Sequence, residues 1–370
     1  MPYIANTDSD VKEMLEAIGC SSFEDMWEKT EITEPFPEIN IPQGRSEFEV
    51  TRIAEKLAAK NEAGLFNFVG GGYYDHLIPA AVGEITGRSE FSTAYTPYQP
   101  EVSQGTLQAI FEYQTAICRL TGMDVSNASM YDGGTALFEA MMLAIRSTRK
   151  RRAVICGAVS PIFRKMLHCY SDNLDVELVE IPAGVTDSSQ NALLEAIDDK
   201  TACVIVQFPN FFGAVEDWTE FVAEVHKKRV LAICSVYPIA LALLKTPGEM
   251  GFDVVTAEGQ CLGIPLSFGG PYLGVMATTK KCMRKMPGRI VGQTVDKTGD
   301  TGYVLTLQTR EQHIRRSNAM SNICSNQNLC LLSAGVYMSL LGKEGLRDVA
   351  KLCASKAIFA KDLLIKIKGI

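Results

Sequence analysis

The sequence of 370 residues lacks several patterns that mark common classes of protein. It has only four histidines, and none of its eleven cysteines belongs to a Cys-x-x-Cys pair, so we expect no cysteine–histidine metal site. It has no apolar run of about 18 residues, and its first ten residues are polar and acidic, unlike a signal peptide. We therefore expect no membrane span and a cytoplasmic location, with the cysteines as free thiols.

Positive charge and the common catalytic signatures are also scarce. Lysine and arginine number 36 against 43 acidic residues, which gives a net charge of −7 and argues against nucleic acid as a partner. The sequence contains no G-x-S-x-G motif, no Walker A motif and no G-x-G-x-x-G between a strand and a helix. These absences direct attention away from serine hydrolases, P-loop enzymes and dinucleotide-binding proteins.

The residues that are present predict an ordinary globular chain. Hydrophobic residues make up 46% and charged residues 21%, and the length permits a large core. Residues 8–29 and 46–61 have the periodicity of helices, and Ser46 with Glu49 has capping-box spacing. Residues 67–105 are rich in glycine, proline and tyrosine, which favours ordered loops over a site. An extended linker between the two helices is indicated by Pro35, Pro37 and Pro42.

From about residue 106 the pattern becomes that of an α/β domain. Five short runs rich in β-branched residues alternate with amphipathic helical segments, which is typical of βαβ units and a mainly parallel sheet. The expected organisation is an N-terminal wrap over residues 1–105, a large α/β domain over 106–308 and the beginning of a small C-terminal domain over 309–370. The expected strands are 153–157, 176–181, 202–208, 230–236 and 254–256.

Three motifs have the residue types of a functional site, and each has a plainer interpretation. Asp132–Ala136 has glycines at a helix start, which suits a phosphate or simply a capped turn. The loop from Tyr95 to Gly105 presents tyrosines, glutamines and a carboxylate between prolines, which suits either a ligand or a partner surface. The segment Thr309–Arg316 places arginines and a histidine along one helical face, for an anionic group or for surface ion pairs.

These motifs, in this order, resemble the P-protein of the glycine cleavage system, and more closely the first (α) subunit of its two-subunit form. The resemblance runs from the first residues to the last. Beyond the three motifs it rests on Gly72–His76 with Ile78-Pro79, Met130–Ala136, Gln207–Gly213, Gly263–Pro271, Lys285–Gly292 and Ser321–Cys324. The family also suggests a further C-terminal portion of some tens of residues, so we expect the chain to be truncated.

The resemblance implies the fold type I architecture of pyridoxal-phosphate (PLP) enzymes. It also implies that the whole enzyme decarboxylates glycine on PLP and passes the aminomethyl group to the lipoyl arm of H-protein. This fold needs a lysine for the cofactor and usually an acid beside the pyridine nitrogen. At the expected strand ends the chain has instead Cys234 with Ser235, and Glu258 followed by Gln260 and Cys261. Both defining residues are missing, so we expect no PLP in this chain and PLP in the partner β subunit.

The expected partners are therefore a β subunit in an α2β2 assembly, lipoylated H-protein and glycine. Our hypothesis is that this chain contributes site residues across the subunit interface, namely Tyr95, Tyr98, Gln99, Glu101 and His76, while Arg310–Arg316 lines the entrance for the lipoyl arm. Two alternatives remain open at this point. The chain is a structural or docking subunit without a catalytic contribution, or it is an autonomous PLP enzyme with a lysine elsewhere.

Overall fold

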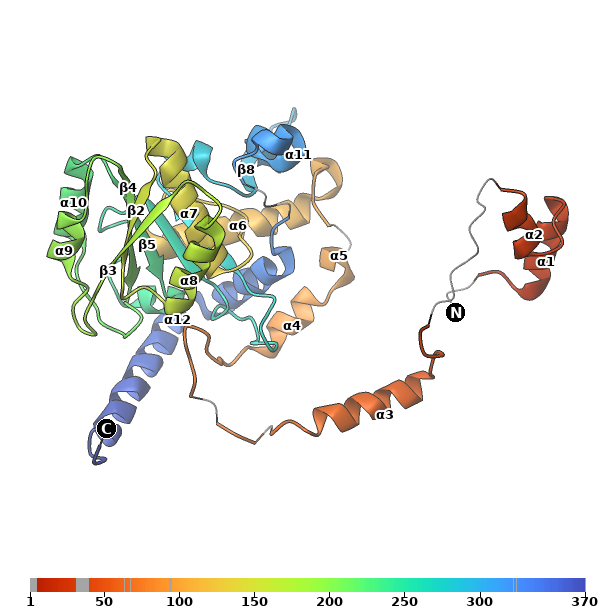
Figure 1. Ribbon diagram of the computed structural model, residues 1–370, viewed down its shortest axis with the longest axis horizontal. Helices are drawn as coiled ribbons and strands as arrows, with labels where there is room; N and C mark the ends of the chain where they lie inside the picture. The colour runs from red at the N-terminus through yellow and green to blue at the C-terminus, as the bar shows by residue number, and fades with distance from the viewer. Residues whose placement is uncertain are drawn as a thin grey trace. The chain divides into compact units, whose positions relative to one another are not determined.

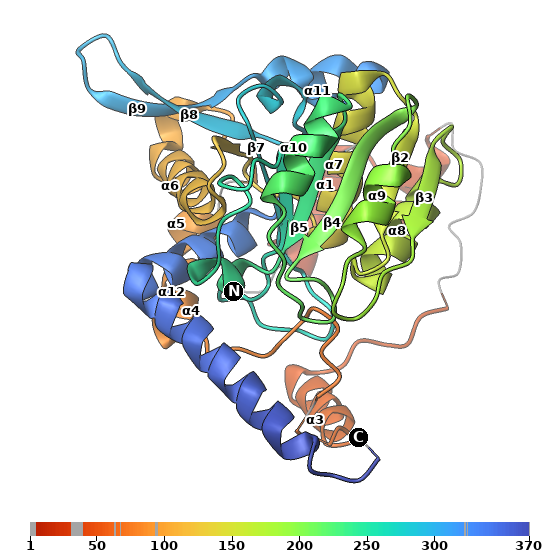
Figure 2. The same cartoon turned by 90° about the vertical axis from the view of Figure 1, so that its left-hand side faces the viewer.

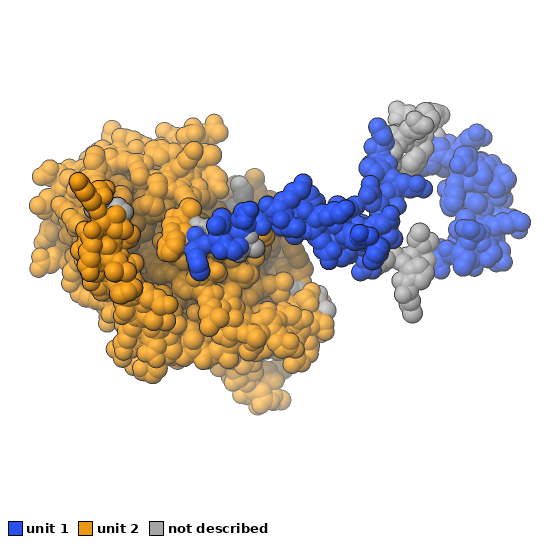
Figure 3. All heavy atoms as spheres, turned by 90° about the horizontal axis from the view of Figure 1, so that it is seen from below, with its two compact units in different colours: residues 1–67 blue, residues 68–370 orange. Residues whose placement is uncertain are grey.

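The computed structural model describes most of the chain, namely residues 5–30, 40–62, 64–66, 68–92, 95–321, 323 and 325–369. Pro35 and Pro37 of the expected linker, and Asn322 and Cys324 of the motif quoted above, lie outside these residues. The chain divides into two compact units, Met1–Asn67 and Phe68–Ile370 (Figure 3). The three-part division expected from the sequence, with boundaries after residues 105 and 308, stays a prediction.

The first unit has three short helices, α1 (Asp8–Ala17), α2 (Phe23–Glu28) and α3 (Glu47–Ala58). The capping box expected at Ser46 is confirmed, because its hydroxyl accepts from the Glu49 amide and the Glu49 carboxylate accepts from the Ser46 amide. The expected helix over 8–29 is two helices, since Gly19 has a φ of +73° and the chain restarts at the Ser22 cap. Among the described residues of this unit, only Leu15 and Cys20 are buried.

The second unit is built on a seven-stranded sheet with the order β1-β7-β6-β5-β4-β2-β3. All five predicted strands are confirmed, and neighbouring members of this group pair in parallel. Of the two further strands, β7 pairs antiparallel with β6, and β1 pairs antiparallel with β7. The strands are β1 (Val125–Ser126), β2 (Arg152–Cys156), β3 (Glu177–Ile181), β4 (Thr201–Phe208), β5 (Leu231–Val236), β6 (Val254–Glu258) and β7 (Gly274–Thr278).

Helices cover both faces of this sheet, as a parallel sheet requires. In Figure 1, α7 and α8 lie on one face, and α9 and α10 on the other. α7 begins beside the end of β6 and packs on α8, so the glycine-rich turn lies against the carboxyl ends of the parallel strands. The bounds are α4 (Ala80–Thr86), α5 (Ser89–Ser92), α6 (Gln104–Thr121), α7 (Gly133–Thr148), α8 (Pro161–Ser171), α9 (Gln190–Glu195) and α10 (Thr219–Lys227).

A separate antiparallel hairpin, β8 (Ile290–Val295) with β9 (Thr301–Thr306), extends from the body beside α6 (Figure 2). Two glutamines of α6 brace it. The Gln114 amide bonds both the N–H and the C=O of Val291, at 3.0 and 2.9 Å. The Gln104 amide does the same to Tyr303, at 2.8 and 2.9 Å. Each side chain thus supplies the two hydrogen bonds that a neighbouring strand would otherwise make.

The last element, α12 (Asn328–Leu364), has 37 residues and a non-helical backbone at Gly342. By length and composition it is apolar enough to cross a membrane, and a third of its most apolar window is buried. Its first half packs against α6 and α4, with Leu331, Ala334 and Tyr337 in the core. This packing accounts for the apolar residues of that half in a folded domain, so the expectation of no membrane span stays a prediction.

Candidate functional site

The loop from Tyr95 to Gly105, here called the tyrosine loop, is held at its base by Gln104, and most of its residues are exposed. A short 3-10 helix, η1 (Pro100–Val102), forms within it, and the Gln104 amide bonds the Pro100 carbonyl at 2.7 Å as well as Tyr303. Gln99 and Glu101 are exposed, and Tyr95 is 82% exposed. These three side chains are therefore available to another molecule.

Two of the predicted tyrosines contact the segments that follow the hairpin. The Tyr95 hydroxyl donates to Ser325 Oγ at 3.2 Å. The Tyr98 hydroxyl accepts from Arg289 Nη2 at 3.2 Å, and the Arg289 guanidinium lies 5.5 Å from the centroid of the Tyr98 ring. The His313 ring lies 5.2 Å from the same ring. The structure therefore brings the tyrosine loop together with the segment Thr309–Arg316.

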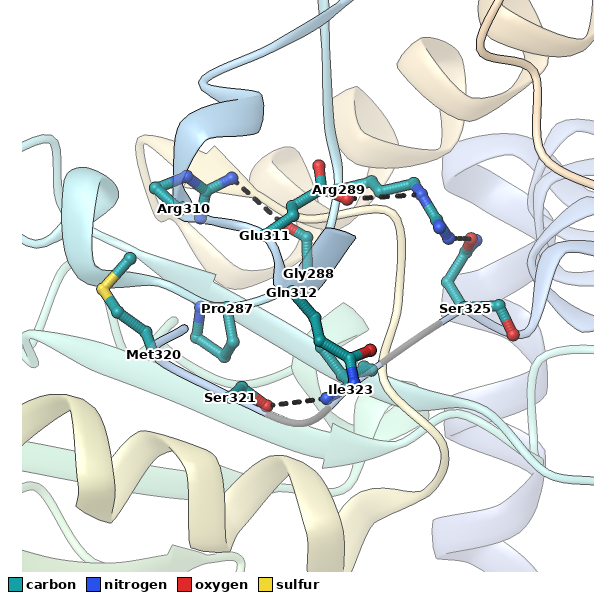
Figure 4. A pocket seen from close by; sticks show the side chains of 11 residues that line it. Pro287, Gly288, Arg289, Arg310, Glu311, Gln312, Met320, Ser321, Ile323 and Ser325 are labelled. Atoms are coloured by element: carbon teal, nitrogen blue, oxygen red, sulfur yellow. Dashed lines mark hydrogen bonds and ion pairs between the residues drawn. The ribbon is translucent and has the colours of Figure 1, made fainter. Parts of the chain in front are cut away.

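Arg289, the partner of Tyr98, also lines a pocket with about 360 Å³ of space, part of it open to solvent (Figure 4). Its polar wall is the ion pair of Arg289 with Glu311, whose Nε and Oε2 are 3.5 Å apart. Figure 4 shows Arg310 turned towards Gly288, whose carbonyl accepts from Nη2 at 3.0 Å. The lining comes from Pro287–Arg289, Arg310–Gln312, and Met320, Ser321, Ile323, Ser325 and Asn326.

The expected helical face of Thr309–Arg316 does not form as a single helix. The segment breaks into η4 (Gln308–Arg310), α11 (Gln312–Arg315) and η5 (Arg316–Asn318). Arg310 points inwards and is buried, and burial lowers the pKa of its guanidinium. Arg310 therefore belongs neither to an exposed anion site nor to a surface helix with ion pairs, because its N–H groups donate to backbone carbonyls within the fold.

His76, the remaining predicted site residue, has different neighbours. Its Nε2 is 2.8 Å from the Tyr237 hydroxyl, and burial lowers the pKa of the His76 ring. The Tyr237 ring in turn packs edge-on against Tyr74, at 5.7 Å between centroids. The Tyr74 backbone is tied to the buried side chain of Gln260, at 3.2 and 3.1 Å. The contacts of His76 thus fix the segment 72–79 on the main domain, and none of them involves the tyrosine loop.

The glycine-rich turn is a capped helix start that a carboxylate of this chain already fills. Asp132 accepts from the Thr135 amide at 2.7 Å, which is the capping interpretation of the motif. The Gly133 amide, which a phosphate would use at a helix N-terminus, donates to Glu258 Oε2 at 2.9 Å. Glu258 Oε1 accepts from the amides of Gln260 and Leu273, at 3.0 and 3.2 Å.

Glu258 is 7% exposed. Burial raises the pKa of its carboxyl to about 7, although the three N–H groups oppose the rise. The site of a possible phosphate is thus occupied by a titratable acid of the chain itself.

The residues around this turn do not fit PLP. A Cβ on Gly134 would stand 2.3 Å from Met166 Sδ, and one on Gly133 would stand 2.9 Å from Phe163 Cζ, so α8 packs directly on the turn. The end of β5 carries the buried Cys234 and Ser235 rather than an acid. The end of β6 carries Glu258 rather than a lysine. A ring, a phosphate and a Schiff-base lysine therefore have no matching residues here.

Within the part of the chain that the structure describes, no cluster of histidine, cysteine, aspartate and glutamate could hold a metal ion. Ten cysteines are described and all are free thiols, and three of them lie in strands of the large sheet, namely Cys156, Cys203 and Cys234.

Two important residues gained no role from the sequence. Arg289 stood within a quoted motif, but nothing in its neighbours showed that it reaches Tyr98, 191 positions earlier. At Glu258 the sequence shows only that the expected lysine is missing. Each of these charged residues lies next to an apolar run. A charged residue in such a place is buried only when it is paired, so this position is the sequence signal that both have a partner.

Comparison with known proteins gives concordant results. A model of the glycine cleavage system P-protein family matches residues 1–369. The probable glycine dehydrogenase (decarboxylating) subunit 1 of Oleidesulfovibrio alaskensis is 53% identical over 370 residues, which is all of this chain and 84% of the relative. The protein of the same name from Geotalea daltonii is 54% identical with the same coverage.

Among solved structures, an inhibitor-bound glycine decarboxylase (P-protein) of the glycine cleavage system matches with a TM-score of 0.92 and 41% identity, over all of this chain and 84% of that one. A sphingosine-1-phosphate lyase from Burkholderia pseudomallei matches with a TM-score of 0.55 and 14% identity, over 88% of this chain and 74% of that one. The second likeness concerns the fold alone, which is that of fold type I PLP enzymes.

Proposed function

The chain belongs to the glycine cleavage system P-protein family, and from this premise we propose that it acts as subunit 1 of a two-chain glycine dehydrogenase (decarboxylating). The whole enzyme would take glycine, release its carboxyl group as CO2 and transfer the aminomethyl group to the lipoyl arm of H-protein. The "subunit 1" in the names of the relatives supports the existence of a second chain.

We place PLP in the second subunit, where it supplies the electron sink for decarboxylation. The observation that carries this assignment is the Gly133–Glu258 contact. A carboxylate of this chain takes the helix amide that would hold a phosphate, and α8 covers the turn. This chain then contributes side chains, not the cofactor.

The proposed contribution comes from the tyrosine loop. Tyr95, Gln99 and Glu101 are exposed polar groups on a loop fixed at its base, which suits residues that reach into a neighbouring subunit. Tyr98 is 44% exposed and backed by Arg289. His76 stays in the proposed set, and with its Nε2 engaged by Tyr237 it would act together with that phenol. Within Arg310–Arg316, the exposed Arg315 and Arg316 are the residues available to line the entrance for the lipoyl arm.

Reconstitution tests the proposal directly. The chain is co-expressed with a candidate second subunit, and glycine–bicarbonate exchange with H-protein is measured for each chain alone and for both. We expect exchange only in the mixture, from an assembly whose stoichiometry (we propose α2β2) is read by light scattering. Full activity of the second subunit alone would reduce this chain to a docking subunit. Activity of this chain alone would contradict the cofactor assignment.

The docking alternative is separated by variants of the loop. Tyr98→Phe and Glu101→Gln change only polar atoms, so the mixture should still assemble, and we expect glycine exchange to fall at least about tenfold for an essential hydrogen bond. Unchanged exchange in both assembled variants would favour a purely structural subunit.

The cofactor assignment has a readout that needs no turnover. The purified chain is incubated with PLP and dialysed, and its absorbance spectrum is recorded beside that of the second subunit treated in the same way. We expect a stoichiometric Schiff-base band only for the second subunit. A band that survives dialysis in this chain would overturn the assignment.

A further inference from the structure

Arg289 joins two segments that are distant in the sequence. Arg289 directly precedes the hairpin and is 5% exposed. Its guanidinium has a different partner on each side. Nη1 donates to Asn326 Oδ1 at 3.2 Å, and Nη2 donates to the Tyr98 hydroxyl at 3.2 Å. Figure 4 shows Arg289 reaching across the pocket rim, with Glu311 beside its Nε.

The contact fixes the direction of the Tyr98 hydroxyl. A guanidinium has only donors, so the phenol oxygen must accept, and its own O–H proton must point elsewhere. Tyr98 remains 44% exposed. Its O–H therefore remains able to donate to a second group, with the Arg289 guanidinium on the other side of the oxygen.

Glu311 lies between the Arg289 guanidinium and the His313 ring, and both of these groups contact Tyr98. Its Oε2 is 3.5 Å from Arg289 Nε and 3.7 Å from His313 Nδ1. The side chains of Arg289 and Glu311 are 6% and 10% exposed, so the pair is well removed from water. A buried pair of this kind contributes little net stability compared with an apolar replacement, which is a reason to look for a role in function.

Resting on the proposed function, we propose that Arg289 is a positioning residue that aims the Tyr98 O–H at the carboxylate of glycine in the assembled enzyme. An O–H donor backed by a guanidinium complements a carboxylate oxygen. Arginine is required because it reaches Asn326 and Tyr98 at once through a planar fork, which a lysine ammonium cannot do.

The test is a double-mutant cycle on the assembled complex with lipoylated H-protein. Tyr98→Phe, Arg289→Lys and the double variant are compared with the wild type for kcat and for the KM of glycine. We expect each single variant to raise the KM about tenfold with a smaller change in kcat, as for the loss of one hydrogen bond to a charged group. The double variant should be no worse than either single variant, because both changes remove one interaction.

Arg152→Lys is the matched control, because Arg152 is also a partly buried, ion-paired arginine, with Asp198 and Glu177, but lies on β2. It should alter thermal stability without changing the KM. If Arg289→Lys does not assemble, Glu311→Gln takes its place in the cycle, since it keeps the Arg289 and Tyr98 side chains but removes the carboxylate that holds the Arg289 guanidinium. The KM should rise in the same way.

A rise of about a hundredfold in the KM of the double variant, which would mean that the two single effects multiply, would overturn the inference. An unchanged KM in Arg289→Lys would overturn it as well. These results differ from failure of the proposed function, in which the wild-type mixture would be no more active than the second subunit alone.

Discussion

At the scale of single residues, the chain keeps a helix N-terminus suited to an anion but fills it from within. Glu258 accepts three backbone hydrogen bonds from three separate segments. Besides burial, the charge of Asp132 raises the pKa of the Glu258 carboxyl. Burial and the nearby Glu258 carboxyl in turn raise the pKa of Tyr73. The consequence is a buried carboxyl whose protonation affects the whole domain.

Glu258 predicts a pH dependence of stability. Its carboxyl pKa rises from 4.5 to about 7 in the folded chain. The folded state therefore binds more protons between these values, and the free energy of unfolding should fall as the pH rises from about 4.5 to above 7. The full loss is about 3 kcal/mol. Urea unfolding at pH 5 and pH 8 should show a loss in the wild type that is about 2–3 kcal/mol larger than the loss in Glu258→Gln.

Glu112→Gln, an exposed change on α6, is the control and should keep the wild-type dependence. Equal pH dependence in the wild type and in Glu258→Gln would show that the carboxyl is ionised throughout.

The glycine at the same turn leads to a second prediction. A Cβ on Gly133 would stand 2.8 Å from the Glu258 nitrogen and 2.9 Å from Phe163 Cζ. We expect Gly133→Ala to lower the free energy of unfolding by about 1–3 kcal/mol, as overpacking does. At Gly105, in the first turn of α6, a Cβ would meet nothing within 4 Å. Gly105→Ala should be neutral or stabilising by up to about 1 kcal/mol, and an equal loss in both variants would argue against the clash.

At the scale of elements, the hairpin depends on two glutamines of α6. Gln104→Ala removes two hydrogen bonds to Tyr303 and one to Pro100. We expect the Tyr303 amide to exchange its hydrogen faster, by about tenfold for each 1.4 kcal/mol of lost stability. Gln108→Ala, whose side chain bonds only Glu112, should leave that amide protected. Unaltered exchange in Gln104→Ala would mean that the strand pairing alone holds the hairpin.

The elements also show which features the sequence could predict. The five parallel strands have near-continuous apolar runs and regular spacing, so their positions followed from the sequence. β7 was missed because it is a short antiparallel return after an irregular glycine loop, Gly269–Pro271. The expected helix over 309–316 was wrong, since Arg310 turns inwards to backbone carbonyls and breaks the periodicity. The contact of Tyr98 with Arg289 depends on tertiary folding, which no local pattern encodes.

At the scale of the whole molecule, much apolar surface is open. Leu65, Phe66, Phe68 and Val69 are 75–93% exposed, and Ile358 and Phe359 on α12 are 61% and 66% exposed. Monomeric proteins rarely expose such surface. This agrees with a chain that works with a partner, as the proposed function requires.

We expect Phe66→Ser with Phe68→Ser to weaken assembly with the second subunit by at least about tenfold, because two large apolar side chains lose their burial. The thermal stability of the isolated chain should be unchanged, since neither side chain is buried in it. Phe212→Ser, which alters a phenylalanine that is 50% exposed, serves as the control. Assembly is measured by analytical ultracentrifugation, and equal affinity for the wild type, the double variant and the control would exclude Phe66 and Phe68 from the interface.

The two glutamine braces also determine how the hairpin meets other chains. A two-stranded sheet has two free edges, and each is a template on which a foreign strand can grow into an aggregate. Val291 pairs with Leu305, and Tyr303 with Gln293, so the backbone groups bonded by Gln114 and Gln104 point outwards from opposite edges. Each edge is thus closed at one residue by a side-chain amide. The projecting hairpin is thereby protected from strand addition without the charges or prolines that usually guard such edges.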